Sequence, residues 1–165
     1  VLKSMTRQLT PRQAFERLAD RAATTEMCST EAEQKLRDWQ IAPEEADAII
    51  DRLIAERYID DRRFAHAYVR DRINNARWGL LKIRRAMRLK RLPNSLIEEA
   101  IDAELNDETY CRNLAAALRS KARSMEQPLL PADRAKLVRF AASRGYEPDL
   151  ILEMVDDEEY WRNAD

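Results

Sequence analysis

The stretch from residue 83 to residue 101, IRRAMRLKRLPNSLIEEAI, decides the fold because the chain carries two further versions of it. Residues 32–50 read AEQKLRDWQIAPEEADAII, and residues 137–155 read LVRFAASRGYEPDLILEMV. Aligned on Ile41, Leu92 and Tyr146, which are 51 and 54 residues apart, the three stretches match without a gap. All fifteen equivalent positions that we compared are apolar: Ala32, Leu36, Ala46, Ile49 and Ile50; Ile83, Met87, Ile97, Ala100 and Ile101; Leu137, Ala141, Ile151, Met154 and Val155. Any two amphipathic helices can be slid into some agreement, but a gapless match across helix, loop and helix favours true repetition.

Helix signals upstream of each stretch extend the unit to three helices of about 50 residues in all. Thr10-Pro11 predicts a first helix start, and Ser29 or Thr30, with Glu33 at capping-box spacing from Thr30, predicts a second. We therefore expect an all-α fold of three tandem three-helix repeats in an elongated, curved array. The expected boundaries are 10–59, a basic second repeat at 60–106, 107–156, and an acidic C-terminal tail at 157–165.

The composition supports a helical protein with a highly charged surface. Only two glycines occur, Gly79 and Gly145, while 36% of the residues are charged. Few glycines argue against sheets with tight turns. Cys28 and Cys111 stand far apart, so a reducing, cytoplasmic environment is expected rather than a disulfide framework. No apolar run approaches the roughly 20 residues of a membrane span, and no membrane partner is expected.

Catalytic constellations are missing from the sequence. His66 is the one histidine, and two glycines cannot build a phosphate-binding loop or a dinucleotide fingerprint. The pair Asp60-Asp61 allows two interpretations, an acid/base or metal site and a helix N-cap. Because free amides and the helix dipole favour carboxylates at a helix start, capping is favoured. We expect no enzyme activity, no cofactor, no metal and no small-molecule substrate.

Charge is distributed very unevenly, although the net charge is only −1. Residues 62–91 hold eleven Lys or Arg and one acid, whereas residues 93–108 hold six acids and no Lys or Arg. Residues 147–165 hold eight acids and one Arg. The middle of the chain is thus strongly basic and its flanks are acidic. Such asymmetry bears on which partners the chain binds and on charge shielding within the chain, and not on the fold.

The run Tyr58-Ile59-Asp60-Asp61-Arg62-Arg63-Phe64-Ala65, followed by Arg72 and Gly79, resembles the RecX family, bacterial regulators of the RecA recombinase. The resemblance extends from about residue 10 to about residue 162, and the segment from Lys136 to Tyr146 looks like the last repeat of that family. Its motif residues are expected to be structural: Tyr58, Asp60, Asp61, Arg63, Phe64 and Arg72.

Two positions depart from the family pattern. Ala86-Met87 stands where the family usually has Glu-Leu, and Arg91 stands where it usually has a glycine before the third helix. The second departure obliges a helix to end without a glycine C-cap.

The resemblance implies a small cytoplasmic protein that binds RecA filaments on DNA. It implies inhibition of RecA ATPase, strand exchange and co-protease activity, and thus a place in DNA repair and the SOS response. We expect the chain to act as a monomer.

The helix predicted at residues 80–91 has a core face of Leu80, Ile83 and Met87 and an outer face of cations, with Leu81 and Leu89 among them. Exposed leucines in a basic field favour a contact surface over a merely solvated charge run. The residues expected to contact RecA or DNA are basic side chains of the second repeat: Arg70, Arg77, Lys82, Arg84, Arg85, Arg88, Lys90 and Arg91. Arg84, Arg85 and Arg88 are all expected to point away from the core. Arg72 lies in an apolar arc and is expected to need an acidic partner.

Two targets suit this face, phosphates of single- or double-stranded DNA and carboxylates of RecA, because Arg pairs with both. The competing function is a stand-alone helical module that binds DNA without sequence specificity. The family motif, the three-unit layout and the acidic ends favour the RecA regulator.

Overall fold

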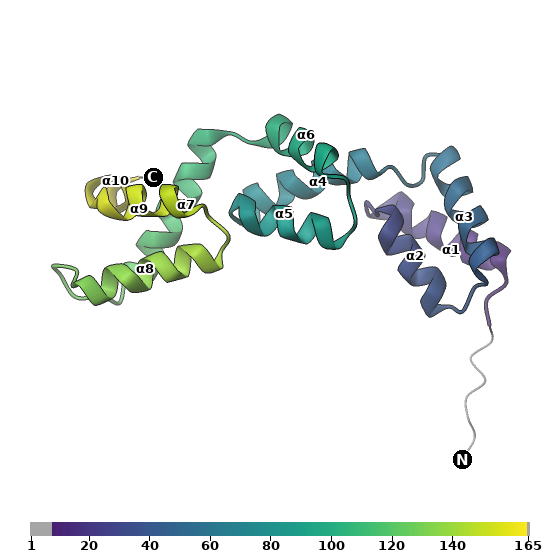
Figure 1. Cartoon of the computed structure of the whole chain (residues 1–165), viewed down its shortest axis with the longest axis horizontal. Helices are drawn as coiled ribbons and strands as arrows, with labels where there is room; N and C mark the ends of the chain where they lie inside the picture. The colour runs from purple at the N-terminus through teal and green to yellow at the C-terminus, as the bar shows by residue number, and fades with distance from the viewer. Residues whose placement is uncertain (1–7, 165) are drawn as a thin grey trace, which may run out of the picture.

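The computed structural model describes residues 8–164, which form α-helices joined by short loops and contain no strand. The helices follow one another as an elongated array (Figure 1). Their bounds are α1 (Pro11–Thr24), α2 (Ser29–Asp38), α3 (Pro43–Ala55), α4 (Asp61–Asn74), α5 (Leu80–Leu89), α6 (Asn94–Glu104), α7 (Asp107–Ala122), α8 (Pro131–Ser143), α9 (Pro148–Asp156) and α10 (Glu158–Asn163). In the described part of the chain, no helix has the length and apolar composition that a membrane-spanning segment requires.

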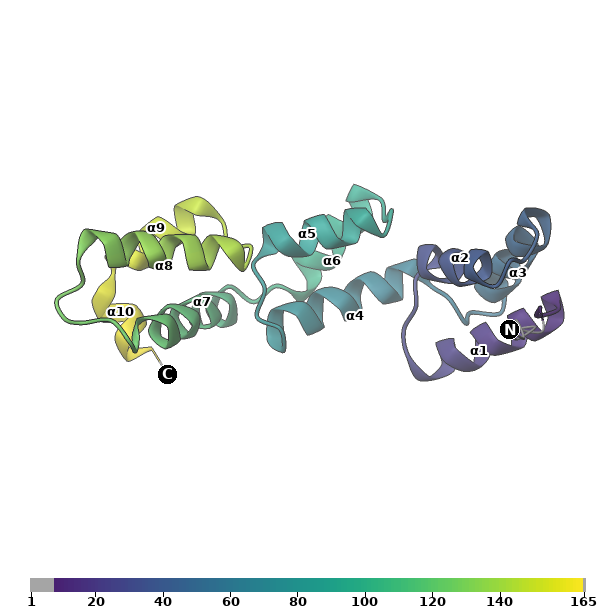
Figure 2. The ribbon, with the colours of Figure 1, turned by 90° about the horizontal axis from the view of Figure 1, so that it is seen from below.

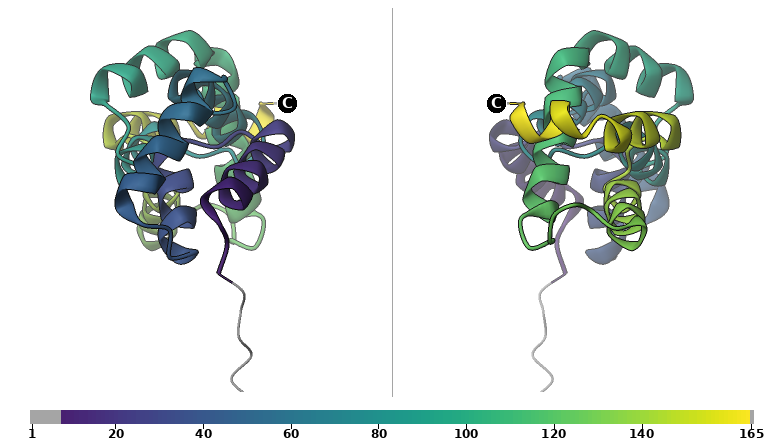
Figure 3. Two further views of the ribbon diagram at one scale, coloured as in Figure 1. Left: turned by 90° about the vertical axis from the view of Figure 1, so that its right-hand side faces the viewer. Right: turned by 90° about the vertical axis from the view of Figure 1, so that its left-hand side faces the viewer.

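The helices come in three successive triplets along the long axis, α1–α3, α4–α6 and α7–α9 (Figure 2). Viewed along that axis, the triplets lie behind one another (Figure 3). The predicted fold class, three tandem three-helix repeats in an elongated array, is therefore confirmed. The triplets fall within the ranges 10–59, 60–106 and 107–156.

The repetition extends to the hydrogen bonds that end the second helix of each triplet. In each, the anchor residue donates its amide to the carbonyl five residues earlier, which is the bond that closes a Schellman motif. The three bonds are Ile41 N to Leu36 O at 3.0 Å, Leu92 N to Met87 O at 3.3 Å and Tyr146 N to Ala141 O at 3.3 Å. The apolar anchors recognised in the sequence are thus the residues that turn the chain from one helix into the next.

A left-handed residue precedes each anchor, because this motif requires a positive φ at that position. Gln40 and Arg91 both have φ 58°, and Gly145 has φ 92°. A side chain in this region costs about 1–2 kcal/mol, which only glycine avoids. Arg91 therefore accepts the same backbone conformation that glycine takes in the third repeat, and the departure from the family pattern leaves the turn unchanged.

The apolar interior is divided unequally among the triplets. Residues of α1–α3 and Ile59 form one buried cluster, in which Leu18, Leu36 and Leu53 are fully buried. The helices α4 to α10 share a second, continuous cluster that also takes in Cys28. The second and third repeats therefore share one core, whereas the first repeat has its own.

The joint between the second and third repeats is a close approach of two backbones at the only glycines in the chain. Gly79 donates its amide to Arg144 O at 2.8 Å, and Leu81 donates to Gly145 O at 3.0 Å. A Cβ on Gly79 would lie 2.1 Å from the carbonyl carbon of Gly145, and a Cβ on Gly145 would lie 2.2 Å from Cβ of Lys82. Neither position has room for a side chain.

Tyr110 completes this joint from α7. Its hydroxyl accepts a hydrogen bond from Leu80 N at 2.8 Å and donates one to the carboxylate of Glu147 at 2.6 Å. Burial is the larger cause and the hydrogen bond to Glu147 the second cause of a pKa well above the usual range for this phenol. Asn113, also from α7, donates to Ile73 O at 2.9 Å. The Tyr110 hydroxyl and the Asn113 amide are thereby paired with groups of the second and third repeats.

Polar and ionic contacts, rather than a continuous core, hold the first repeat to the second. The Asp61 carboxylate accepts from Ser29 N at 2.7 Å and from Ser29 Oγ at 3.1 Å. Thr30 Oγ1 donates to Lys90 O at 2.6 Å, and Lys90 Nζ lies 2.5 Å from the Glu31 carboxylate. These contacts fix the start of α2 against α4 and against the end of α5.

Two expectations are wrong at the level of single elements. Ser29 and Thr30 are not N-caps, because α2 begins at Ser29 with Cys28 as its N-cap residue and their hydroxyls serve the joint. Of the segment expected as an acidic C-terminal tail, 157–165, the described residues instead pack against the fold, since residues 158–163 form α10 and Trp161 is fully buried in the second core. Asp165 lies outside the described residues.

Replacing Gly145 by Ala should destabilise the protein by about 2–4 kcal/mol, because it adds left-handed strain and an overlap with Lys82. Chemical denaturation followed by circular dichroism measures the loss. The matched control is Gln40→Gly at the equivalent position of the first repeat, where relief of the strain should leave stability unchanged or raised. Equal stability of Gly145→Ala and the parent chain would contradict the close approach.

Replacing Asp61 by Ala should loosen the first repeat from the second, because Ser29 N loses its acceptor. Hydrogen exchange should show a much faster-exchanging Ser29 amide. Asp60→Ala is the control, since Asp60 is the N-cap that accepts from Arg63 N at 3.0 Å and its loss costs about 1 kcal/mol without touching the joint. Unchanged protection of Ser29 in Asp61→Ala would rule out this role.

Candidate interaction surface

The basic segment 62–91 is largely neutralised within the fold. Seven of its eleven cations have a carboxylate within salt-bridge distance. These pairs are Arg62–Glu99, Arg63–Glu26, Arg70–Glu104, Arg72–Asp71, Arg84–Glu98, Lys90–Glu31 and Arg91–Glu33. The charge excess seen in the sequence is therefore much smaller on the folded surface.

Two of these pairs, both with carboxylates of α6, have two hydrogen bonds each. Arg84 makes two parallel hydrogen bonds to Glu98, at 2.8 and 2.9 Å, and Arg70 makes two to Glu104 at the same distances. The bonds to Glu98 raise the pKa of Arg84, and in return they lower the pKa of the Glu98 carboxyl. Of the three arginines expected to point away from the core, Arg84 lies half-buried across the α5–α6 interface, where Glu98 pairs with it.

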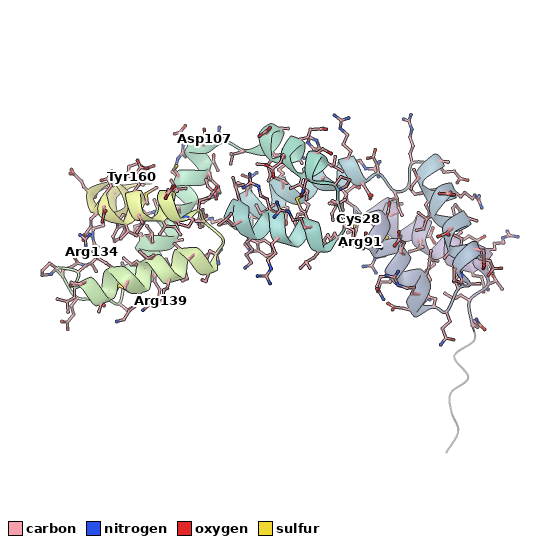
Figure 4. The ribbon with its side chains drawn as sticks, viewed as in Figure 1. Cys28, Arg91, Asp107, Arg134, Arg139 and Tyr160 are labelled. Carbon is pink, nitrogen blue, oxygen red and sulfur yellow. The ribbon has the colours of Figure 1, made fainter. Side chains whose placement is uncertain are left out.

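Lys90 and Arg91 are held at the joint with the first repeat. Lys90 pairs with Glu31, and Arg91 pairs with Glu33, both carboxylates being on α2. Figure 4 shows Arg91 at the end of α5 that is nearer to the first repeat. These two cations connect the repeats, so a partner would have to compete with α2 for them.

Arg77, Lys82, Arg85 and Arg88 are the cations of the basic segment that have no carboxylate partner among residues 8–164. Arg85 and Arg88 are exposed on α5, and Arg88 bonds the neutral side chain of Asn94 at 3.0 Å. The ammonium of Lys82 lies 4.3 Å from the centre of the Trp78 ring. Of the eight cations predicted to contact a partner, these four are the ones that the fold leaves available.

A groove of about 470 Å³ lies beside these cations, between α5 and the C-terminal end of α8. The α5 side contributes Leu81, Lys82, Arg85, Ala86 and Leu89, with Trp78 from the preceding loop, and the α8 side contributes Ala142, Ser143 and Gly145. Leu81 is 45% exposed and Leu89 is 75% exposed. We call this feature the α5–α8 groove. The predicted juxtaposition of leucines and cations on the outer face of α5 is present in the structure.

The run from Tyr58 to Ala65, which carries most of the family resemblance, lies at the joint between the first and second repeats. Tyr58 packs edge-on against Phe15 of the first core, while Phe64 stacks on Tyr68 in the second. Asp60 caps α4, and Asp61 bonds Ser29 of α2. These four residues of the motif thus make contacts within the fold.

Two arginines of the motif also bond within the fold. Arg63 Nε lies 2.6 Å from the Glu26 carboxylate, and Nη2 of the same guanidinium donates to Tyr58 O at 3.2 Å. Arg72 lies 4.6 Å from the Tyr68 ring and 4.8 Å from the Trp78 ring, and a guanidinium nitrogen lies 3.0 Å from the Asp71 carboxylate. Arg72 is thus held mainly by two aromatic rings, in addition to the acidic partner that the sequence led us to expect.

Sequence reasoning missed that the third repeat carries an exposed cation at the repeat position of Arg85. Arg139 is exposed on α8 and stands seven residues before its anchor, as Arg85 does in the second repeat. Figure 4 shows Arg139 on the outer edge of α8. The repeat alignment contained this signal, but charge was counted by segment rather than by repeat position.

No constellation typical of catalysis is assembled among residues 8–164. No group of three His, Cys, Asp or Glu that could hold a metal is found there. His66 is half-buried between α4 and α6, with Nδ1 3.1 Å from Glu104 and Nε2 3.4 Å from Glu99. It is therefore part of an interhelical polar cluster with Glu99 and Glu104 of α6.

Comparisons with known proteins agree with one another. Residues 60–101 match the family model described as RecX, second three-helix domain. The chain is 31% identical over 144 residues to a regulatory protein RecX of Chromohalobacter salexigens, covering 86% of this chain and 88% of the relative. It is 28% identical over 150 residues to a regulatory protein RecX of Prosthecochloris aestuarii, covering 88% and 93%.

Solved structures share the fold. The crystal structure of RecX from Lactobacillus salivarius superposes with a TM-score of 0.77 at 19% identity, covering 90% of this chain and 96% of that one. A further crystal structure of regulatory protein RecX gives a TM-score of 0.78 at 22% identity, with 90% and 72% covered. With sequence identity above 30% over most of both chains, and the same three-helix repeats, this chain belongs to the RecX family of regulatory proteins.

Proposed function

We propose that this protein regulates RecA by binding the RecA filament on DNA, and that binding lowers RecA ATPase, strand exchange and co-protease activity. Membership of the RecX family over most of the chain carries the proposal. The elongated array and the exposed basic, apolar face of α5 support it, because a filament offers an extended, repeating target. The protein would act in the cytoplasm, as a monomer, in DNA repair and the SOS response.

The competing function is non-sequence-specific DNA binding by the isolated protein. Four cations of the basic segment lack a carboxylate partner in the described chain, which is a small number for strong phosphate binding. The third helices of the repeats are also acidic, with four acids each on α3 and α6 and three on α9. The acids of α6 are mostly paired with arginines, but the four acids of α3 have no Lys or Arg partner among residues 8–164 and would repel a bare duplex, so the RecA regulator is favoured.

The protein should lower the DNA-dependent ATPase of RecA when present at less than one molecule per RecA monomer, since one array can contact several subunits. A coupled ATPase assay measures this, and affinity for bare single- and double-stranded DNA is measured in the same buffer. Full RecA turnover at a molar excess of the protein would refute the proposal. Tight binding to bare DNA together with unchanged RecA turnover would favour the competing function.

Reversing Arg85 and Arg88 to Glu should weaken filament binding while leaving the fold intact, because both side chains are exposed and have no carboxylate partner among the described residues. If both contact DNA phosphates, the slope of log affinity against log salt should flatten by roughly 1.4–1.8. If they contact carboxylates, affinity should fall with a smaller change in slope.

Two controls separate this effect from others. Arg21→Glu with Arg123→Glu changes the net charge equally at exposed positions on α1 and just after α7, and this variant should bind like the parent chain. Arg84→Glu should lower the thermal midpoint, because it sets two carboxylates against each other across the α5–α6 interface. Parent-like filament binding by the Arg85, Arg88 variant at every salt concentration would contradict a contact role for this face.

A further inference from the structure

We propose that the α5–α8 groove binds a protein segment in which an apolar side chain is flanked by carboxylates. The inference rests on the proposed function, and it assigns this segment to the filament protein rather than to DNA. The groove combines two exposed leucines, Leu81 and Leu89, with the cations Lys82 and Arg85 on the same helix. A ligand that suits it must offer both apolar surface and negative charge.

The inner face of α5 already contacts a partner of this chemistry. There α6 places Ile97 in the core shared with Ile83, and Glu98, the next residue, makes two bonds to Arg84. At its end, α5 meets the carboxylates of α2 through Lys90 and Arg91. Segments with an apolar residue beside a carboxylate thus contact the inner face and the end of α5, whereas the exposed leucines and cations of its outer face have no covering segment among residues 8–164.

A nucleic acid strand would satisfy only half of this surface. Phosphates could pair with Lys82 and Arg85, but they would leave Leu89 in water at 75% exposure. Strands without a read sequence are usually held by bases stacked on aromatic rings. The Trp78 ring is already occupied, with Lys82 at 4.3 Å and Arg72 at 4.8 Å from its centre. A protein segment covers the leucines and neutralises the cations together.

The groove is preformed, which lowers the entropic cost of binding. Its α8 wall is fixed to α5 by the hydrogen bonds of Gly79 with Arg144 and of Leu81 with Gly145, at 2.8 and 3.0 Å. The two walls therefore belong to different repeats but cannot move apart without breaking this joint. A volume of about 470 Å³ is enough for a few side chains.

The leucines are a property of the second repeat alone. The position of Leu89 is held by Asp38 in the first repeat and by Ser143 in the third, and both are exposed. The position of Leu81 is held by Thr30 and Ala135. Since the repeat architecture does not require a leucine at either place, we infer that these side chains serve a contact that only this groove makes.

The test compares Leu89→Asp with Leu152→Asp, a matched change at an exposed leucine of α9 outside the groove. Binding to RecA filaments assembled on single-stranded DNA is measured by fluorescence anisotropy. Leu89→Asp should bind about tenfold more weakly or worse, because it loses a buried leucine contact and adds a charge of the partner's sign. Leu152→Asp should bind like the parent chain.

Two outcomes would overturn the inference. One is parent-like filament binding by Leu89→Asp. The other is an equal loss of affinity for bare single-stranded DNA in that variant, which would assign the groove to nucleic acid.

A peptide probe separates this inference from the proposed function. A labelled peptide with one leucine between two pairs of acidic residues should bind the parent chain at least about fivefold more tightly than the same peptide with glycine for leucine. Leu89→Asp should abolish this preference. If the parent chain does not bind RecA filaments but prefers the leucine peptide to the glycine peptide, the proposed function fails and the assignment of the groove to an acidic, apolar protein segment holds. Filament binding by the parent chain without any preference for the leucine peptide would overturn the groove assignment instead.

Discussion

The close approach of two backbones at Gly79 and Gly145 is the constraint on which the rest of the structure depends. It lets the loop before α5 hydrogen-bond directly to the turn after α8, so that α4 to α10 share one core. A side chain at either position would collide with the opposite backbone or with Lys82. Because the same contact fixes α5 beside α8, it also shapes the groove that we propose as a protein-binding site.

The first repeat is attached by a different kind of interaction. Its core is closed off from the second, and side chains such as Ser29, Thr30 and Glu31 meet Asp61 and Lys90 across the joint. Apolar packing is insensitive to salt, whereas exposed and half-exposed ion pairs are screened by it. The two joints of the array therefore differ in physical character, one being a close backbone approach beside a shared apolar core and the other a set of polar and ionic contacts.

Internal charge pairing decides how a basic sequence becomes a much less basic surface. The acidic segment that follows the basic one in the chain folds back as α6 and neutralises Arg70 and Arg84. What remains is concentrated near α5, next to Leu81 and Leu89. Internal pairing therefore leaves a small surface that combines a few cations with exposed leucines. Surfaces of this mixed composition are typical of protein–protein contacts.

The sequence by itself determined the helices, the three-unit layout and most of the core, because local periodicity and the repeat both depend on residues near one another in the chain. It also predicted the outer face of α5 with its exposed leucines. Only the tertiary structure decided that Ser29 and Thr30 serve a joint instead of capping α2, that Trp161 ties α10 into the core, and that Arg84 is paired while Arg85 is not. A hydroxyl or a guanidinium can bond whatever lies within reach, and its partners here are up to 69 residues away in the chain. Which partner it finds is therefore set by how the repeats stack, which periodicity along one segment does not encode.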